Sequence, residues 1–121
     1  MKIKFLDLHQ QYLSIKDEID SAISETISKS SFVGGNSIIE FEEKFKTYHE
    51  SKYCLGVGNG TDALEISLEA LNLPVGSEII VPANSFISSA EAISRNNFKV
   101  VFCDVSPFDY NIDLDDLKKR I

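Results

Sequence analysis

Several residue types on which whole classes of protein depend are scarce in this sequence. Its 121 residues include no tryptophan, one methionine, three prolines, two cysteines and two histidines. Cys54 and Cys103 each lie in an apolar run typical of a buried strand, so we expect two buried, reduced thiols rather than a disulfide. His9 and His49 have no partner at the spacing of metal ligands, and we expect no zinc site.

Positive charge and long apolar runs are also scarce. Lysine and arginine number 12 against 19 aspartates and glutamates, giving a net charge of -7. Such a chain repels phosphate backbones and anionic membranes, which disfavours nucleic-acid and membrane partners. No apolar run reaches the ~20 residues that span a bilayer, and the first residues lack the apolar stretch of a signal peptide. We therefore expect a globular, cytoplasmic protein.

The first 50 residues have the periodicity of helices. Apolar or partly apolar side chains recur every three or four residues from position 8 to position 26, which predicts one helical face. The members of that face are Leu8, Tyr12, Ile15, Ile19, Ala22 and Thr26. Residues 31–36 interrupt this pattern. Asn36 is then expected to cap a second helix, whose apolar face contains Ile38, Phe41, Phe45 and Tyr48.

After about residue 51 the pattern alternates between strands and helices. Short apolar runs predict strands at 53–57, 78–81 and 99–104, and helices are expected at 61–72, at 88–96 and after a cap at Asp113. This alternation predicts an α/β layer with several parallel strands. We therefore divide the chain into a helical segment of about 1–50 and the start of an α/β domain at about 51–121. Because the sequence ends inside the last predicted helix, we expect a longer protein.

The most informative segment, residues 56–64, takes a predicted strand through a glycine turn into a helix. Its sequence is Gly-Val-Gly-Asn-Gly-Thr-Asp-Ala-Leu. Glycines let an anion approach the backbone, and the first N–H groups of a helix have no internal partner. Thr61 adds a hydroxyl donor. Asp62 suits the helix dipole but would repel a phosphate unless its carboxylate points away.

Other interpretations of this loop remain open. A dinucleotide fingerprint would need glycine in place of Thr61 and an acidic residue after the next strand. A Walker A loop would need a lysine that is absent. The Asn59-Gly60 dipeptide is typical of a hairpin turn, although the residues after it have helical spacing. Residues 59–61 also match a glycosylation signal. A plain tight turn between strand and helix is also compatible with the spacing.

A second segment, residues 81–90, follows the next predicted strand. It therefore lies at the carboxyl end of that strand, the edge where open α/β sheets bind ligands. Phe86 in this segment is placed to stack on a flat ring. The competing interpretation is that Phe86 is an aromatic residue of the core.

These segments together resemble the DegT/DnrJ/EryC1/StrS family of sugar aminotransferases, which use pyridoxal phosphate (PLP). The resemblance extends along the whole chain, and its motifs occur in the family's order and spacing. The matching stretches are residues 5–8 with Gln11 and Tyr12, 32–35, Phe41, Glu42 and Phe45, 56–64, 78–86 and 109–113.

The resemblance implies the large domain of the aspartate aminotransferase fold, here its N-terminal part. It implies that Gly60, Thr61 and Asp62 hold the PLP phosphate and that Phe86 stacks on the pyridine ring. It places Phe32 and Gly34 near the substrate entrance. It further implies a homodimer that aminates a nucleotide-linked keto-deoxysugar, with the ketone at carbon 3 or 4 and glutamate as the amino donor.

No residue of this chain lies in a motif that matches the catalytic residues of the family. The lysine that binds PLP and the aspartate that pairs with the pyridine nitrogen are expected beyond residue 121, so we expect residues 1–121 alone to be inactive. Two other hypotheses remain open. One is a non-catalytic module that binds a phosphate or nucleotide, and the other is an assembly module whose amphipathic helices dock on a partner.

Overall fold

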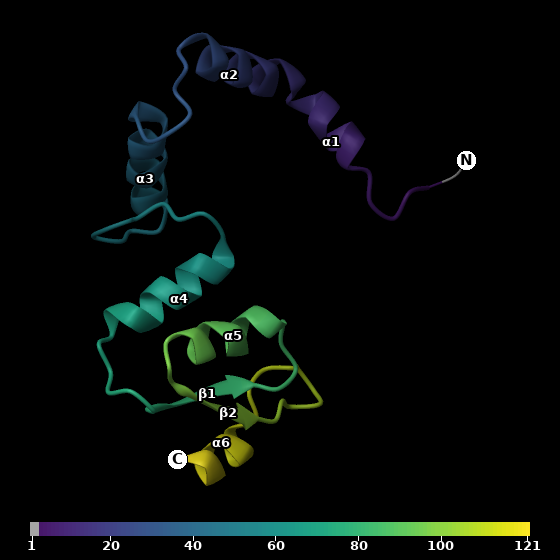
Figure 1. Cartoon of the computed structure of the whole chain (residues 1–121). Coiled ribbons are helices and arrows are strands. Elements are labelled where there is room, and N and C mark those ends of the chain that lie inside the picture. The colour runs from purple at the N-terminus through teal and green to yellow at the C-terminus, as the bar shows by residue number, and fades with distance from the viewer. Residues whose placement is uncertain (1–2) are drawn as a thin grey trace. The chain divides into compact units, whose positions relative to one another are not determined.

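The structure, a computed structural model, describes residues 3–121. Residues 1–2, at the start of the predicted helical segment, lie outside the described residues. The chain divides into two compact units, with the boundary between Gly56 and Val57. Each unit is described by itself, and its elements are labelled in Figure 1.

The first unit contains three helices: α1 (Leu8–Ser14), α2 (Lys16–Ser28) and α3 (Asn36–Tyr48). The sequence predicts one helix across the first two, but the structure breaks it at Ile15. There the Ser14 hydroxyl donates to the Gln11 carbonyl at 2.7 Å, and the Ile15 N–H donates to the Tyr12 carbonyl instead. The serine therefore competes for the carbonyl that a continuous helix would use.

The prediction that Asn36 caps the next helix is wrong. Gly35 occupies the cap position of α3 with a φ of 93°, and Asn36 is already the first helical residue. No side-chain hydrogen bond caps this helix. Glycine is accepted at such a cap because it adopts a positive φ without a steric penalty.

The second unit is built around a parallel pair of strands. In chain order it contains α4 (Gly60–Ala70), β1 (Glu78–Pro82), α5 (Ile87–Arg95), β2 (Lys99–Cys103) and α6 (Leu114–Arg120). The two strands pair in parallel, with Ile80 opposite Val101. A parallel connection needs a crossover, and α5 provides it. Helix α5 packs against both strands and α4, while α6 contacts β2 (Figure 1).

The buried core also belongs to this second unit. Its members are Val81 of β1, Ala92 and Ile93 of α5, and Cys103 of β2. They are all apolar and come from the two strands and their crossover helix. The parallel α/β arrangement predicted from the sequence is therefore confirmed, with its centre in the β1–α5–β2 segment.

The strand predicted at 53–57 is absent from the structure. A strand forms only when its backbone groups bond to a neighbour, and here the Gly56 N–H donates instead to Glu42 Oε1 at 2.7 Å. Cys54 in this segment is consequently half-buried, so the prediction of a buried thiol is wrong for it. Cys103 is buried as predicted, and both cysteines are free thiols.

The cap predicted at Asp113 is confirmed. Its Oδ1 accepts hydrogen bonds from the N–H groups of Asp115 at 2.8 Å and Asp116 at 2.9 Å. Asp113 thus provides acceptors for two of the free donors at the start of α6. Within residues 3–121, no helix is long and apolar enough to cross a membrane.

Candidate functional site

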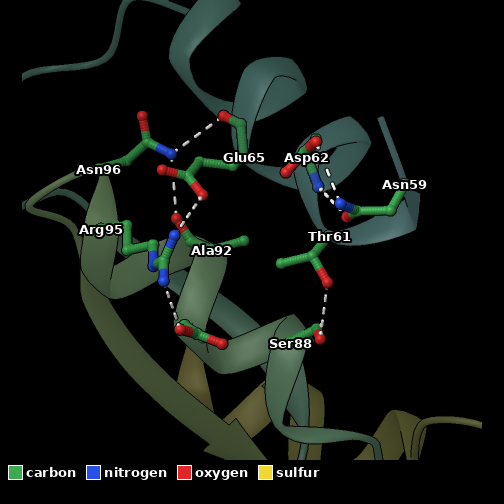
Figure 2. A network of polar contacts seen from close by, with 9 residues as sticks. Asn59, Thr61, Asp62, Glu65, Ser88, Ala92, Arg95 and Asn96 are labelled. Carbon is green, nitrogen blue, oxygen red and sulfur yellow. Dashed lines mark hydrogen bonds and ion pairs between the residues drawn. The ribbon is translucent and has the colours of Figure 1, made fainter. Parts of the chain in front are cut away.

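The glycine turn before α4 is fixed by two hydrogen bonds between Asn59 and Asp62. The Asp62 N–H donates to Asn59 Oδ1 at 2.9 Å, and Asn59 Nδ2 donates to Asp62 Oδ2 at 3.1 Å (Figure 2). Asn59 is extended, with φ -166° and ψ 178°, and is the N-cap of the helix. The turn is therefore closed by its own side chains, with Asn59 as the helix cap.

Gly58 leaves room for the same arrangement. A Cβ atom at this position would lie 2.6 Å from Asp62 Oδ2, closer than two nonbonded atoms can approach. Because Asn59 holds that carboxylate, it cannot move aside without losing a hydrogen bond. The Asp62 carboxylate is thus kept against Gly58 and Asn59.

The first two residues of α4 have free backbone N–H groups. Within residues 3–121, the N–H groups of Gly60 and Thr61 donate no hydrogen bond. A Cβ at Gly60 would meet no atom within 4 Å, so the space beside it is open. Two free donors at the positive end of a helix dipole suit an anion. The Asp62 N–H, by contrast, already has a partner in Asn59.

Thr61 connects this turn to α5. Its hydroxyl donates to Ser88 Oγ at 2.9 Å across a partly buried contact. Thr61 is the second residue of α4 and Ser88 the second of α5, so the first turns of the two helices meet at this bond (Figure 2). The site is therefore formed by two helix N-termini.

A second set of contacts holds α4 and α5 together further along both helices. Asn96 Nδ2 donates to the Glu65 carbonyl at 3.0 Å and to the Ala92 carbonyl at 2.9 Å. Arg95 pairs with Glu65 at 3.4 Å and with Glu91 at 2.9 Å (Figure 2). The two helices therefore contact each other at both levels.

Phe86 immediately precedes α5 as its N-cap residue. Phe86 is 77% exposed, so it does not belong to the core of the described residues. Phe86 lies two residues before Ser88, which bonds to Thr61. An exposed ring at this position is available to stack on a flat ligand.

Phe32 and Gly34 lie in the first unit, between α2 and α3. Phe32 is exposed, and Gly34 has a φ of 67°, in the left-handed region that favours glycine. Among the described residues, no group of three or more histidine, cysteine, aspartate or glutamate side chains is arranged to hold a metal ion.

Residues 13–121 match the model of the DegT/DnrJ/EryC1/StrS aminotransferase family. The chain belongs to this family. Its glycine turn, the helix that follows and the segment containing Phe86 all lie within the matched range.

Relatives and solved structures agree with this assignment. The chain is 37% identical over 119 residues to dTDP-3-amino-3,6-dideoxy-alpha-D-galactopyranose transaminase of Aneurinibacillus thermoaerophilus, covering 98% of this chain and 33% of that protein. DesV of S. venezuelae, solved in complex with a ketimine intermediate, is 30% identical with a TM-score of 0.92 over 99% of this chain and 32% of its own. The structure of ntda from Bacillus subtilis, solved with bound cofactor PMP, is 30% identical with a TM-score of 0.90 over 99% of this chain and 28% of its own.

These matches confirm the predicted fold class, that of aminotransferases in this family. The chain spans about a third of the length of the relatives it matches.

Two residues of the candidate site, Asn59 and Ser88, are not predicted from the sequence. The sequence pattern marks Asn59 as part of a turn or of a glycosylation signal, although an asparagine directly before a helix is also a common N-cap. Ser88 had no sequence signal, since it acts through a side chain 27 positions away. The structure thus adds a cap and a cross-helix hydroxyl to the predicted Gly60, Thr61 and Asp62.

Proposed function

We propose that this chain is part of a PLP-dependent sugar aminotransferase and that the first turn of α4 binds the phosphate of the cofactor. The observation that carries the proposal is the pair of unspent N–H groups on Gly60 and Thr61, beside the Thr61 hydroxyl and open space. Membership of an aminotransferase family supports it, as does the PMP bound in the similar structure of ntda.

The residues present fit a phosphate ester. Gly60 and Thr61 would donate their N–H groups to it, and the dipole of α4 would favour its negative charge. Asp62 would act indirectly, because its N–H and its carboxylate both bond to Asn59. Phe86 would cover one face of the pyridine ring. Bound PLP supplies an electron sink for amino-group transfer.

The remaining groups of the reaction are proposed to lie outside residues 1–121. A transaminase needs a lysine that binds PLP and a carboxylate at the pyridine nitrogen. The lysines of this chain occur in no matching motif, so we propose that residues 1–121 alone do not transaminate. A mixture of this chain, PLP and glutamate should convert cofactor no faster than PLP without protein, as followed by absorbance.

The proposed substrate is a nucleotide-linked keto-deoxysugar, with the ketone at carbon 3 or 4 and glutamate as amino donor. The name of the Aneurinibacillus thermoaerophilus relative, a transaminase of a dTDP-linked amino sugar, supports this class. We also propose a homodimer. Exposed apolar side chains on all three helices of the first unit support an interface there, since such surfaces mark interaction sites. They include Leu13, Ile23, Ile27, Ile39 and Phe41.

The test of the cofactor site is a titration of the complete protein with PLP. Thr61→Ala should weaken PLP binding by about 1–3 kcal/mol, the cost of a hydrogen bond lost from a charged group. Thr47→Ala is the matched control, because the Thr47 hydroxyl bonds only to the Glu43 carbonyl within α3. Equal affinities for the wild type and Thr61→Ala would remove Thr61 from the site.

The same titration separates the proposal from its alternatives. A non-catalytic phosphate module would bind PLP without transferring an amino group from glutamate. An assembly module would not bind PLP. Phe86→Ala should weaken PLP binding by about 1 kcal/mol if its ring stacks on the cofactor, and unchanged affinity would exclude that role.

A further inference from the structure

The Thr61–Ser88 hydrogen bond limits what these hydroxyls can give to a phosphate. Each hydroxyl carries one hydrogen, so the pair has two. One of these hydrogens forms the bond between the two hydroxyls, because the Thr61 hydroxyl donates to Ser88 Oγ at 2.9 Å. Among the described residues, the Ser88 hydroxyl accepts this bond and donates none. The pair therefore has one hydrogen left for a ligand, and in this structure Ser88 carries it.

Other donors at Ser88 are also unspent. Within residues 3–121, the N–H groups of Ile87 and Ser88 donate no hydrogen bond, just as those of Gly60 and Thr61 do not. Helix α5 has no side-chain cap of its own. The hydroxyl contact thus brings the positive ends of two helix dipoles to one place.

We propose that Ser88 is a phosphate-positioning residue and that it works with Thr61 as one hydroxyl pair. The pair donates a single hydrogen to the phosphate, and each hydroxyl fixes the oxygen of the other. This inference rests on the proposed PLP site and adds the start of α5 to it. Loss of either hydroxyl leaves the other without its hydrogen-bond partner, so the direction of the remaining hydrogen is no longer fixed.

The contacts at the far end of the helices support this role. Asn96 ties α5 to the Glu65 carbonyl at 3.0 Å, and Arg95 pairs with Glu65. These contacts hold the helices in place independently of Ser88. Removing the Ser88 hydroxyl should therefore change the binding of phosphate without separating α4 from α5.

The experiment compares PLP with pyridoxal, which has no phosphate, on the complete apo-protein. Ser88→Ala and Thr61→Val should each weaken PLP binding roughly tenfold and leave pyridoxal binding unchanged. The double variant should lose less than the sum of the two single losses, because each hydroxyl is directed by the other. Ser88→Thr, which keeps the hydroxyl, should restore PLP affinity. Ser94→Ala is the control on the same helix, since the Ser94 hydroxyl bonds only to the Ala90 carbonyl.

Each other outcome overturns the inference. Unchanged PLP affinity in Ser88→Ala removes Ser88 from the site. Equal losses for PLP and pyridoxal show a structural role, and additive losses in the double variant show two independent hydroxyls. If Ser88→Ala does not fold, Ser88→Cys, with a weaker donor of similar size, takes its place. A wild-type protein that does not prefer PLP to pyridoxal overturns the proposed function itself, which separates the two failures.

Discussion

The two units of the chain differ in how deeply their residues are buried. The second unit buries Val81, Ala92, Ile93 and Cys103, all of them apolar. Among residues 3–56 nothing is buried, and the half-buried residues are mostly polar. They are Asp7, Tyr12, Asp20, Thr26, Glu42, Lys46 and Cys54. Hydrophobic burial thus organises the second unit, whereas the first keeps its large apolar side chains exposed.

The first unit is consequently held by local interactions. The Asp7 side chain caps α1 by accepting from the Gln10 N–H, and ion pairs such as Lys29–Glu25 join successive turns of one helix. Exposed contacts of this kind contribute little individually. The candidate phosphate site lies instead beside the core, at the starts of two helices, one of which contributes two core residues. A site that must hold donors in fixed positions benefits from such support.

The largest test of this contrast compares two isoleucines. Ile93 is 2% exposed and Ile23 is 54% exposed. Ile93→Ala should lower the free energy of unfolding by about 2–5 kcal/mol through lost burial and a cavity, whereas Ile23→Ala should cost less than about 1 kcal/mol. Denaturant titration of both variants measures the difference. A similar cost for Ile23→Ala would mean that its helix face is covered in the assembled protein.

The core and its parallel strands were predictable because their signals are local. Short apolar runs around Ile80 and Val101, with a helix between them, predict a parallel pair. The strand predicted at 53–57 carries the same local signal and was wrong. Its outcome depends on a neighbouring strand, and that is a non-local property that the sequence pattern does not contain.

The candidate site shows the same division. Gly60 and Thr61 were found from a glycine turn that leads into a helix, a pattern confined to a few residues. The bond to Ser88 was missed because it depends on how α4 packs against α5. The break at Ile15 was missed for another reason: one serine hydroxyl competes for a single carbonyl, which periodicity does not register.

The cysteines offer a second test, since each unit contains one. Burial, and then the nearby Asp116 carboxylate, raises the pKa of the Cys103 thiol, so less of it is the reactive thiolate at a given pH. Cys54 is only half-buried. Iodoacetamide should therefore modify Cys54 well before Cys103, as followed by mass spectrometry of peptides. Denaturant should equalise the two rates, and faster modification of Cys103 in the native protein would contradict the buried core.

A smaller loss of stability is expected when an asparagine at the start of a helix is replaced. Asn59 caps α4 by accepting from the Asp62 N–H, while Asn36 makes no capping bond at α3. Asn59→Ala should therefore cost about 1 kcal/mol of stability, and Asn36→Ala should be close to neutral. Thermal unfolding of the two variants tests this pair. Equal losses would show that the second asparagine also acts as a cap.

The smallest expected effect concerns two carboxylates with lowered pKa values, one in each unit. A hydrogen bond from Lys29, and then its charge, lowers the pKa of Glu25. For Asp116 the first cause is the backbone N–H of Asp104, followed by Arg120. The Glu25 side chain is 62% exposed and that of Asp116 is 16% exposed. Because salt screens exposed charges more than a backbone hydrogen bond, the two pKa values should respond differently to ionic strength.

Both groups should stabilise the fold in the same pH range. A carboxylate whose pKa is lower in the folded protein contributes its full stabilisation above the pKa of the unfolded chain, and loses it as the pH falls through the folded pKa. The pKa values in the unfolded chain are near 4.5 for Glu25 and 3.8 for Asp116, so the stabilisation is lost below these pH values.

Asp116→Asn should flatten this acid-induced loss of stability at both low and high salt, while Glu25→Gln should do so only at low salt. Carboxylate titration by NMR at two salt concentrations checks the cause directly: the Glu25 pKa should return toward its usual value in high salt, and that of Asp116 should stay low. Equal salt responses would show that Asp116 is held mainly by the charge of Arg120, and the two units would then stabilise their carboxylates in the same way.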